Sequence, residues 1–148
     1  MDVRPLRDGE LEAWLDLRVA LWPESSRSEH ADDRELVLDD PERYAVLVVD
    51  DGAGRLCAFA EVSLREWAEG CESRPVGYLE GWYVAPTHRR RGLGRALIEA
   101  AERWAFARGS RELASDADLD NTASQAAHAA LGFREIGRSV LFAKSIGR

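Results

Sequence analysis

Residues 80–109 read EGWYVAPTHRRRGLGRALIEAAERWAFARG, a strand-like run, a basic loop and a helical run in immediate succession. The strand formers end at Pro86, and the loop passes through Gly92 and Gly94 before apolar residues return with helical spacing. Gly109 ends the helical run. The apolar face of this helix is expected to carry Leu93, Leu97, Ile98, Ala101, Trp104 and Ala105.

Strand, glycine turn and helix together predict a binding site for an anion. The first amides of a helix have no acceptor within the helix, and the helix dipole is positive at that end. Four arginines surround this point in the sequence, namely Arg89, Arg90, Arg91 and Arg95. A phosphate or pyrophosphate is therefore the expected ligand. The alternative is a basic turn that caps an ordinary surface helix.

The composition indicates one globular domain that spans residues 1–148. The chain has 148 residues, of which 45% are hydrophobic and 32% are charged, enough for one substantial core. The first residues lack the apolar stretch of a signal peptide, and no apolar run reaches the length of a membrane span, so we expect a cytoplasmic protein with no membrane partner. Cys57 and Cys71 lie far apart and outside any metal-binding spacing, so neither a disulfide nor a metal site is expected.

The charge distribution is compatible with a cationic small molecule as partner. The formal net charge is −7, which argues against binding a nucleic-acid backbone over a broad surface. Carboxylates gather in residues 24–40, 61–72 and 116–120, and an acidic surface concentrates a cationic substrate. The charge alone is equally compatible with a role in solubility.

The remaining sequence alternates strand and helix patterns. Helices are expected from Asp8 as N-cap to Trp22, from Ser28 as N-cap through Leu38, and from Asp120 or Asn121 to Leu131. Residues 65–74 form a polar loop that is longer than a usual hairpin connection. Strands are expected over residues 3–6, 44–49, 56–64, 76–84, 113–117, 133–136 and 139–144.

The motif Arg89-x-x-Gly92-x-Gly94 resembles the pyrophosphate loop of the GNAT N-acetyltransferases. It lacks the Gly-Lys-Ser/Thr end of a Walker loop and the spacing of the Rossmann G-x-G-x-x-G. The order of expected elements is also similar to that family over the whole chain. The resemblance implies a single-domain α+β GNAT fold, in which helices flank a mixed, mostly antiparallel sheet and the fourth and fifth strands splay apart.

Further stretches resemble one branch of the family, the bacterial aminoglycoside 6'-N-acetyltransferases of antibiotic resistance. This likeness implies that acetyl-CoA donates an acetyl group to the 6'-amine of an aminoglycoside by direct attack in a ternary complex, without a metal, and that the protein is a homodimer. The matching stretches are Leu21-Trp22, Ser73-x-Pro75-Val76-Gly77-x-Leu79-Glu80-Gly81, Tyr83-Val84-x-Pro86-x-His88-Arg89-Arg90, Ala114-Ser115-Asp116-Ala117-x-Leu119-Asp120-Asn121 and Leu131-Gly132-Phe133.

The resemblance assigns the coenzyme to two backbone stretches. The pyrophosphate would bind the loop and the helix start, and the pantetheine would pair with the open edge of the splayed strand, where a backbone N–H would also stabilise the oxyanion. Asn121 would cap the last helix and contact the cofactor. The cofactor-binding residues are then Trp82, Tyr83, Val84, Arg89, Arg90, Arg91, Gly92, Leu93, Gly94, Arg95 and Asn121.

Three side chains are the candidates for acid–base chemistry. Glu80 interrupts an apolar strand, where a carboxylate must face either solvent or a site, and the adjacent Gly81 suggests a close approach to the backbone. Asp116 stands where a short strand ends, and the resemblance makes it the candidate base and an ammonium contact. His128 occupies the position of the usual GNAT tyrosine, where its imidazole is either the general acid or a packing residue.

Two tryptophans are the candidate contacts to a sugar ring, together with Glu80 and Asp116. Trp22 ends the first helix and Trp67 lies in the polar loop, positions that cover the aminoglycoside in the resembled enzymes. Trp22 is equally well placed for a core role, and Trp14 and Trp104 are expected in the core.

Two other functions remain open. In the first, the chain is a GNAT acetyltransferase whose acceptor is a polyamine, a small metabolite amine or a protein lysine. In the second, the chain is a catalytically inactive CoA-binding module.

Overall fold

The computed structural model describes residues 1–147, which form a five-stranded sheet and four α-helices. The chain contacts divide the structure into a sheet unit, Met1–Asp116, and a C-terminal unit that begins at Ala117. In chain order the elements are β1 (Arg4–Pro5), η1 (Asp8–Glu10), α1 (Leu11–Leu21), α2 (Arg27–Leu38), β2 (Tyr44–Asp50), β3 (Leu56–Arg65), β4 (Val76–Val84), η2 (Pro86–His88), α3 (Leu93–Ala107), β5 (Leu113–Ser115) and α4 (Thr122–Ala130).

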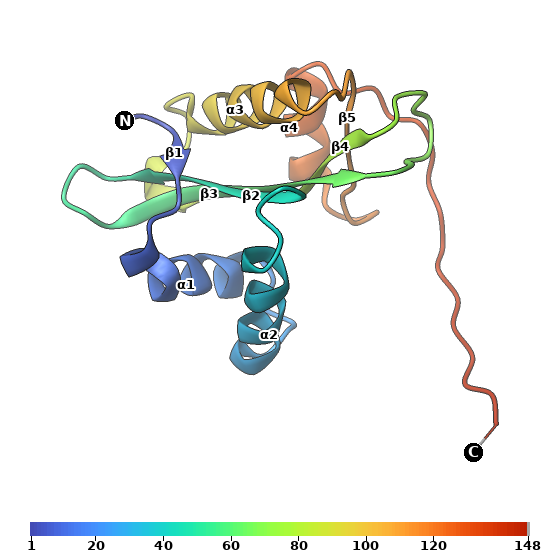
Figure 1. The fold of residues 1–148 in the computed structure, drawn as a ribbon, viewed down its shortest axis with the longest axis horizontal. Coiled ribbons are helices and arrows are strands. Elements are labelled where there is room, and N and C mark those ends of the chain that lie inside the picture. The colour runs from blue at the N-terminus through green and yellow to red at the C-terminus, as the bar shows by residue number, and fades with distance from the viewer. Residues whose placement is uncertain (148) are drawn as a thin grey trace. The chain divides into compact units, whose positions relative to one another are not determined.

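The sheet has the simple order β1-β2-β3-β4-β5. The first four strands pair antiparallel, and β4 and β5 are parallel. Figure 1 shows α3 over one face of this sheet and α1 with α2 over the other. The expected mixed sheet between helices is therefore confirmed.

A β-bulge in β4 determines which face each of its side chains reaches. Glu61 of β3 pairs with Gly81 and the next residue of β3, Val62, pairs with Leu79, so Glu80 is an extra residue without a partner. Such a bulge re-aims the side chains that follow it. Glu80 hydrogen-bonds Ser63 of β3, whereas Trp82 contacts α3, although strict alternation would place both on one face.

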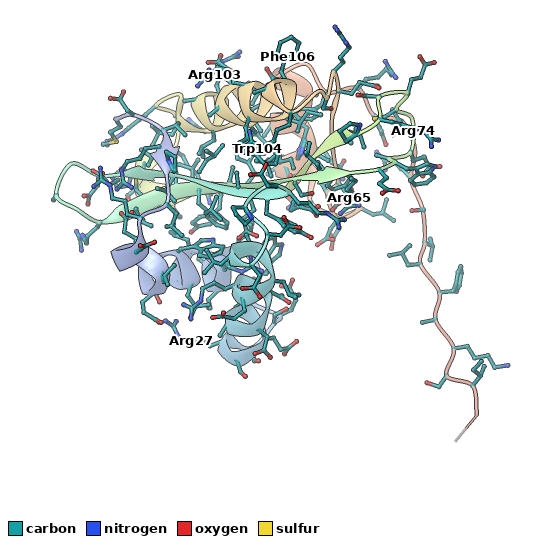
Figure 2. The ribbon with its side chains drawn as sticks, in the orientation of Figure 1. Arg27, Arg65, Arg74, Arg103, Trp104 and Phe106 are labelled. Carbon is teal, nitrogen blue, oxygen red and sulfur yellow. The ribbon has the colours of Figure 1, made fainter. Side chains whose placement is uncertain are left out.

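Apolar side chains cover both faces of the sheet. On the α1 side, Trp14 and Leu17 pack with buried side chains of β2 and β3, namely Val46, Val48 and Phe59. On the α3 side, the helix packs so close that a Cβ at Gly77 would lie 2.7 Å from the Cβ of Ala105. The buried residues of α3 are Leu93, Leu97, Ile98, Ala101 and Ala105, as the sequence predicts. Trp104 is only half-buried; Figure 2 shows it on the sheet side of α3, with Phe106 on the outer side.

Two expected helix caps are wrong. Asp8 belongs to the 3₁₀ turn η1, in which Glu10 accepts from the Arg7 amide. The second helix is capped by Ser26, whose hydroxyl accepts from the Glu29 amide while Glu29 accepts in return. Ser28 is therefore a residue of the first turn. A capping box satisfies two amides at once, which favours the earlier serine.

The C-terminal unit contains α4 and an extended segment. Asn121 caps α4 by accepting from the Ser124 amide, and Gly132 follows the helix with a φ of +92°, both as expected. The expected strands over residues 133–136 and 139–144 are wrong, because no strand is present between residues 133 and 147. Strand-forming residues need a partner for their backbone groups, and this segment pairs with no strand of its own chain.

Candidate active site

The loop before α3 presents the start of the helix to an anion. Gly92 precedes α3 with a φ of +79°, and Arg90 also has a positive φ, of +64°. The first amides of α3 have no acceptor within the helix. Arg91 is exposed beside them, whereas the Arg89 Nε donates to the Val84 carbonyl at 2.8 Å. Arg89 thus ties the loop to the end of β4.

Gly94 brings the same loop against β4. The Trp82 indole N–H donates to the Gly94 carbonyl at 3.2 Å, and a Cβ at Gly94 would lie 3.2 Å from the indole ring. A side chain at this position would therefore crowd the tryptophan. The two glycines serve different needs, since Gly92 supplies the backbone conformation and Gly94 supplies the space.

The outer edge of β4 pairs with β5 over only a short stretch, and the Val84 carbonyl at its end accepts from Arg89. The parallel pairing joins Gly77 to Leu113 and ends at Leu79 with Ser115, whereas β4 continues to Val84. Within the sheet unit, the backbone groups of residues 80–84 on this side face no strand. An extended amide-bearing ligand can pair with such an edge. This edge and the helix start together fit the pantetheine and the pyrophosphate of a coenzyme A molecule.

A pocket of about 590 Å³ opens on the face of the sheet that α1 and α2 cover, opposite to α3. Its lining comes from the end of α1, from α2 and from the polar side chains of β3 and β4, and it includes Trp22, His30, Glu61, Ser63, Arg65 and Glu80. β4 therefore contributes Glu80 to the pocket and its outer edge to the coenzyme site. Two substrates could meet across this one strand.

A buried ion pair forms the floor of the pocket. The Arg18 guanidinium hydrogen-bonds both carboxylate oxygens of Glu61, and the Trp14 indole donates to Glu61 at 3.0 Å. Burial raises the pKa of Glu61, and the contacts with Arg18 and Trp14 oppose that rise. Arg18 also lies 4.8 Å from the Trp22 ring centroid, which positions the indole at the pocket wall.

Trp22 packs in the core and also lines the pocket, while its contact to a sugar ring stays a prediction. Its ring packs edge-on against Phe59 in the core and stacks on His30 in the pocket. A Cβ at Gly81 would lie 2.6 Å from the Trp22 ring, so the group that approaches the backbone there is this indole. Gly81 therefore makes room for Trp22.

A polar network joins Glu80 to Asp116. Arg65 donates two hydrogen bonds to the Glu80 carboxylate, at 3.0 and 2.7 Å, and Ser63 donates a third at 2.6 Å. The Arg65 guanidinium also lies 3.4 Å from the ring centroid of Tyr78, whose hydroxyl donates to Asp116 at 2.5 Å. Burial and this hydrogen bond raise the pKa of Tyr78, so the phenol keeps its proton. Figure 2 shows Arg65 on the side of the sheet that faces α2.

The loop between β3 and β4 exposes Trp67. Its side chain is 64% exposed, whereas the neighbouring Ala68 is buried. The far end of the loop is fixed, since Glu112 accepts from the amides of Glu72 and Ser73 at 2.7 and 2.6 Å. Trp67 is therefore presented to solvent from an anchored loop, as a surface contact to a ligand requires.

His128 lies in the C-terminal unit, on α4. Its Nδ1 lies 2.7 Å from the Ser124 carbonyl, which can only accept, so the neutral ring carries its proton on Nδ1. The ring also packs edge-on against Phe133. An acid role therefore requires the imidazolium, with a second proton on Nε2.

Sequence reasoning missed four residues that support the candidates. Arg18, Glu61, Arg65 and Tyr78 surround Trp22, Glu80 and Asp116 within the sheet unit. Glu61 offered the same signal as Glu80, a carboxylate inside an apolar strand. The arginines and the tyrosine offered none. Cys57 and Cys71 form no disulfide within the described residues, and the described part of the chain contains no cluster of His, Cys, Asp and Glu that could hold a metal.

Comparisons with known proteins agree with this geometry. Residues 10–133 match the model of the acetyltransferase (GNAT) family. The aminoglycoside N(6')-acetyltransferase type 1 of Klebsiella aerogenes is 43% identical over 146 residues, which cover 97% of this chain and 96% of that one. The enzyme of the same name from Serratia marcescens is 46% identical over 139 residues, with coverage of 93% and 94%.

Solved structures of aminoglycoside acetyltransferases are also similar to this chain. The aminoglycoside antibiotic 6'-N-acetyltransferase AAC(6')-IG from Acinetobacter haemolyticus superposes with a TM-score of 0.92 at 38% identity, over 99% of this chain and all of that one. AAC(6')-Iy in complex with a bisubstrate analogue of CoA and acetylneamine superposes with a TM-score of 0.88 at 39% identity, over 98% of each chain. No described helix combines the length and the apolar character that a membrane crossing needs.

Proposed function

Because the chain belongs to the GNAT acetyltransferase family, we propose that it transfers the acetyl group of acetyl-CoA to the 6'-amine of an aminoglycoside. The observation that carries the proposal is the double role of β4. This strand directs Glu80 into a polar pocket that Trp22 also lines, and beyond Leu79 its outer edge pairs with no strand of the sheet beside the loop before α3. Acetylation of such a drug is a route to antibiotic resistance.

The coenzyme is held by backbone more than by side chains. The amides at the start of α3 receive the pyrophosphate, with Arg90, Arg91 and Arg95 as surrounding positive charge, and the outer edge of β4 at Trp82–Val84 pairs with the pantetheine. An N–H of this edge stabilises the oxyanion of the thioester carbonyl. Asn121 is proposed as a further contact, compatible with its cap.

The chemistry is one displacement in a ternary complex. The neutral amine attacks the thioester carbon, the N–C bond forms, the C–S bond breaks, and the thiolate of CoA leaves. Asp116 takes the proton lost from the nitrogen, directly or through water, and the thiolate gains a proton from a general acid, for which His128 as imidazolium is the candidate. Both cysteines lie outside this constellation, Cys57 being buried, so no acetyl-enzyme is needed.

The acceptor is recognised by charge and by flat apolar surface. Aminoglycosides carry several ammonium groups on sugar rings, and the pocket offers carboxylates together with the Trp22 indole. Trp67 offers a second exposed indole on the loop before β4. Glu80 and Asp116 are the proposed contacts for the reacting end of the molecule.

The decisive assay follows release of free CoA thiol from acetyl-CoA. Neomycin and paromomycin form a matched pair, because paromomycin carries a hydroxyl where neomycin carries the 6'-amine. Turnover with neomycin, kanamycin and tobramycin but not with paromomycin is expected. Equal rates for the pair would refute the 6'-position. Turnover confined to spermidine or peptides would move the acceptor to another amine, and tight acetyl-CoA binding without any turnover would identify an inactive CoA-binding module.

We also propose that the protein is a cytoplasmic homodimer. The extended C-terminal segment exposes large apolar side chains, with Leu141 91% and Phe142 92% exposed, and β5 has no strand on its outer edge within the sheet unit. Strand pairing with a second copy would bury these apolar side chains and would provide a partner for the outer edge of β5. Analytical ultracentrifugation should give twice the mass of the chain, and a deletion from residue 138 onward should give the monomer. A monomeric full chain would refute the proposal.

A further inference from the structure

Arg65 occupies the place that a substrate cation would take on Glu80. Its Nε and terminal nitrogen each bind one oxygen of the Glu80 carboxylate, which is the strongest geometry for this kind of pair. The guanidinium also stacks on Tyr78, and Ser63 donates to the same carboxylate. The Glu80 side chain is 26% exposed and Arg65 41% exposed, so both remain reachable from the pocket.

The other charges around this pair already have partners or lie further out. Arg18 of α1 pairs with Glu61 of β3 and lies 3.5 Å from Asp33 of α2. Tyr78 of β4 donates to Asp116, which follows β5. The remaining charged or titratable groups that line the pocket are Glu24, His30, Arg43 and Tyr44. Glu80 is thus the pocket carboxylate that forms its ion pair with Arg65.

Beside the base Asp116, a second carboxylate without a counter-ion at the reacting amine would work against the reaction. An opposite charge within a few ångströms stabilises the charged form of a group, so a bare carboxylate would hold the amine as its ammonium ion. The ammonium ion has no lone pair and cannot attack a thioester. Each unit by which the pKa of the amine rises reduces its neutral fraction about tenfold near neutral pH.

We propose that Arg65 is the built-in counter-ion of Glu80, and that it lets this carboxylate orient the acceptor while the amine stays in its neutral, nucleophilic form. Arg65 is therefore a positioning residue that acts through Glu80. Attraction of the polycation is left to the rim of the pocket, where Glu24 and Asp33 are exposed. The inference rests on the proposed function, because it concerns the amine of that acceptor.

The test compares Arg65→Gln with the wild type in the thiol-release assay across pH. The variant keeps hydrogen-bonding groups but removes the charge. We expect the KM for tobramycin to fall, kcat at pH 7 to fall about tenfold, and the rise of kcat with pH to move about one unit to higher pH. Calorimetric titration of tobramycin in two buffers of different ionisation enthalpy supplies a readout without acetyl-CoA. The wild type should release more protons on binding than the variant.

Two matched variants separate this effect from loss of charge or loss of structure. Arg43→Gln removes a pocket arginine that forms no ion pair within the described chain; it contacts the Leu64 carbonyl and the Tyr44 ring. This variant should lower the KM without moving the pH profile. Arg65→Lys keeps the charge and should keep the profile of the wild type, even if Arg65→Gln folds poorly.

The outcomes distinguish the inference from the proposed function. An active wild type whose Arg65→Gln variant has an unchanged pH profile, or an equal loss of kcat at every pH, refutes the inference alone. A shifted profile in Arg43→Gln or in Arg65→Lys also refutes it. A wild type that acetylates no aminoglycoside refutes the proposed function and the inference with it.

Discussion

The contact between Gly81 and Trp22 makes a quantitative prediction for Gly81→Ala. The added Cβ would lie 2.6 Å from one carbon of the Trp22 ring and 2.9 Å from a second. Carbon atoms in contact rest at about 3.5–4.0 Å, so the ring must retreat by roughly 1 Å. The ring is held on its other sides by Phe59, His30 and the Arg18 guanidinium, so this movement disturbs the core and the pocket together.

The expected cost is that of overpacking a well-filled site. Such substitutions lower the free energy of unfolding by about 1–3 kcal/mol. For a domain of this size, each kcal/mol lowers the Tm by roughly 2–4 °C, so we expect a fall of roughly 2–12 °C. Because Trp22 lines the pocket, the KM for an aminoglycoside should rise, whereas the KM for acetyl-CoA should change little.

Urea unfolding and steady-state kinetics measure both effects, and a double-mutant cycle assigns them. In the background of Trp22→Phe, whose ring is smaller, Gly81→Ala should cost at least about 1 kcal/mol less than in the wild type. Gly9→Ala is the matched control, because a Cβ at Gly9 meets nothing within 4 Å. An equal cost of Gly81→Ala in both backgrounds, or a Tm like that of the Gly9→Ala control, would show that the indole does not require this glycine.

Three further substitutions test Asp116, the loop before α3 and the Arg4–Glu10 ion pair. Asp116→Asn should lower kcat about 100-fold or more while calorimetry finds the acetyl-CoA affinity unchanged; equal turnover would remove this carboxylate from the mechanism. Gly94→Ala should crowd Trp82, which a Cβ would approach to 3.2 Å, and should raise the Kd for CoA several-fold; unaltered CoA binding would contradict the proposed loop. The Arg4 guanidinium lowers the pKa of Glu10 from 4.5 to about 2, so the stability that this pair contributes is present above pH 4.5 and is lost as the pH falls toward 2. Glu10→Gln should therefore be less stable than the wild type at pH 7, with a difference that shrinks through this window in urea unfolding.

The coenzyme loop and most elements could be predicted because their signals are local. The strand Val76–Val84 has the expected bounds, and the expected helix after the glycine loop is present as Leu93–Ala107. Glycine at position 92, with its positive φ, is a requirement of one turn of the backbone. The prediction of strands after Gly132 was wrong for the opposite reason. A strand forms only when another strand pairs with it, and the sequence of the strand itself does not identify that partner.

The sequence by itself determined the family, the loop before α3, two groups of the pocket, Trp22 and Glu80, and the nearby Asp116, because residue types and their spacing express these features. Only the tertiary structure decided how those groups interact. The bulge leaves the Glu80 carboxylate on the face of Ser63 and Arg65 and turns Trp82 to the opposite face, against α3. Register, bulges and ion pairs depend on which strands meet and in what alignment, and residues far apart in the chain settle that jointly when the sheet forms.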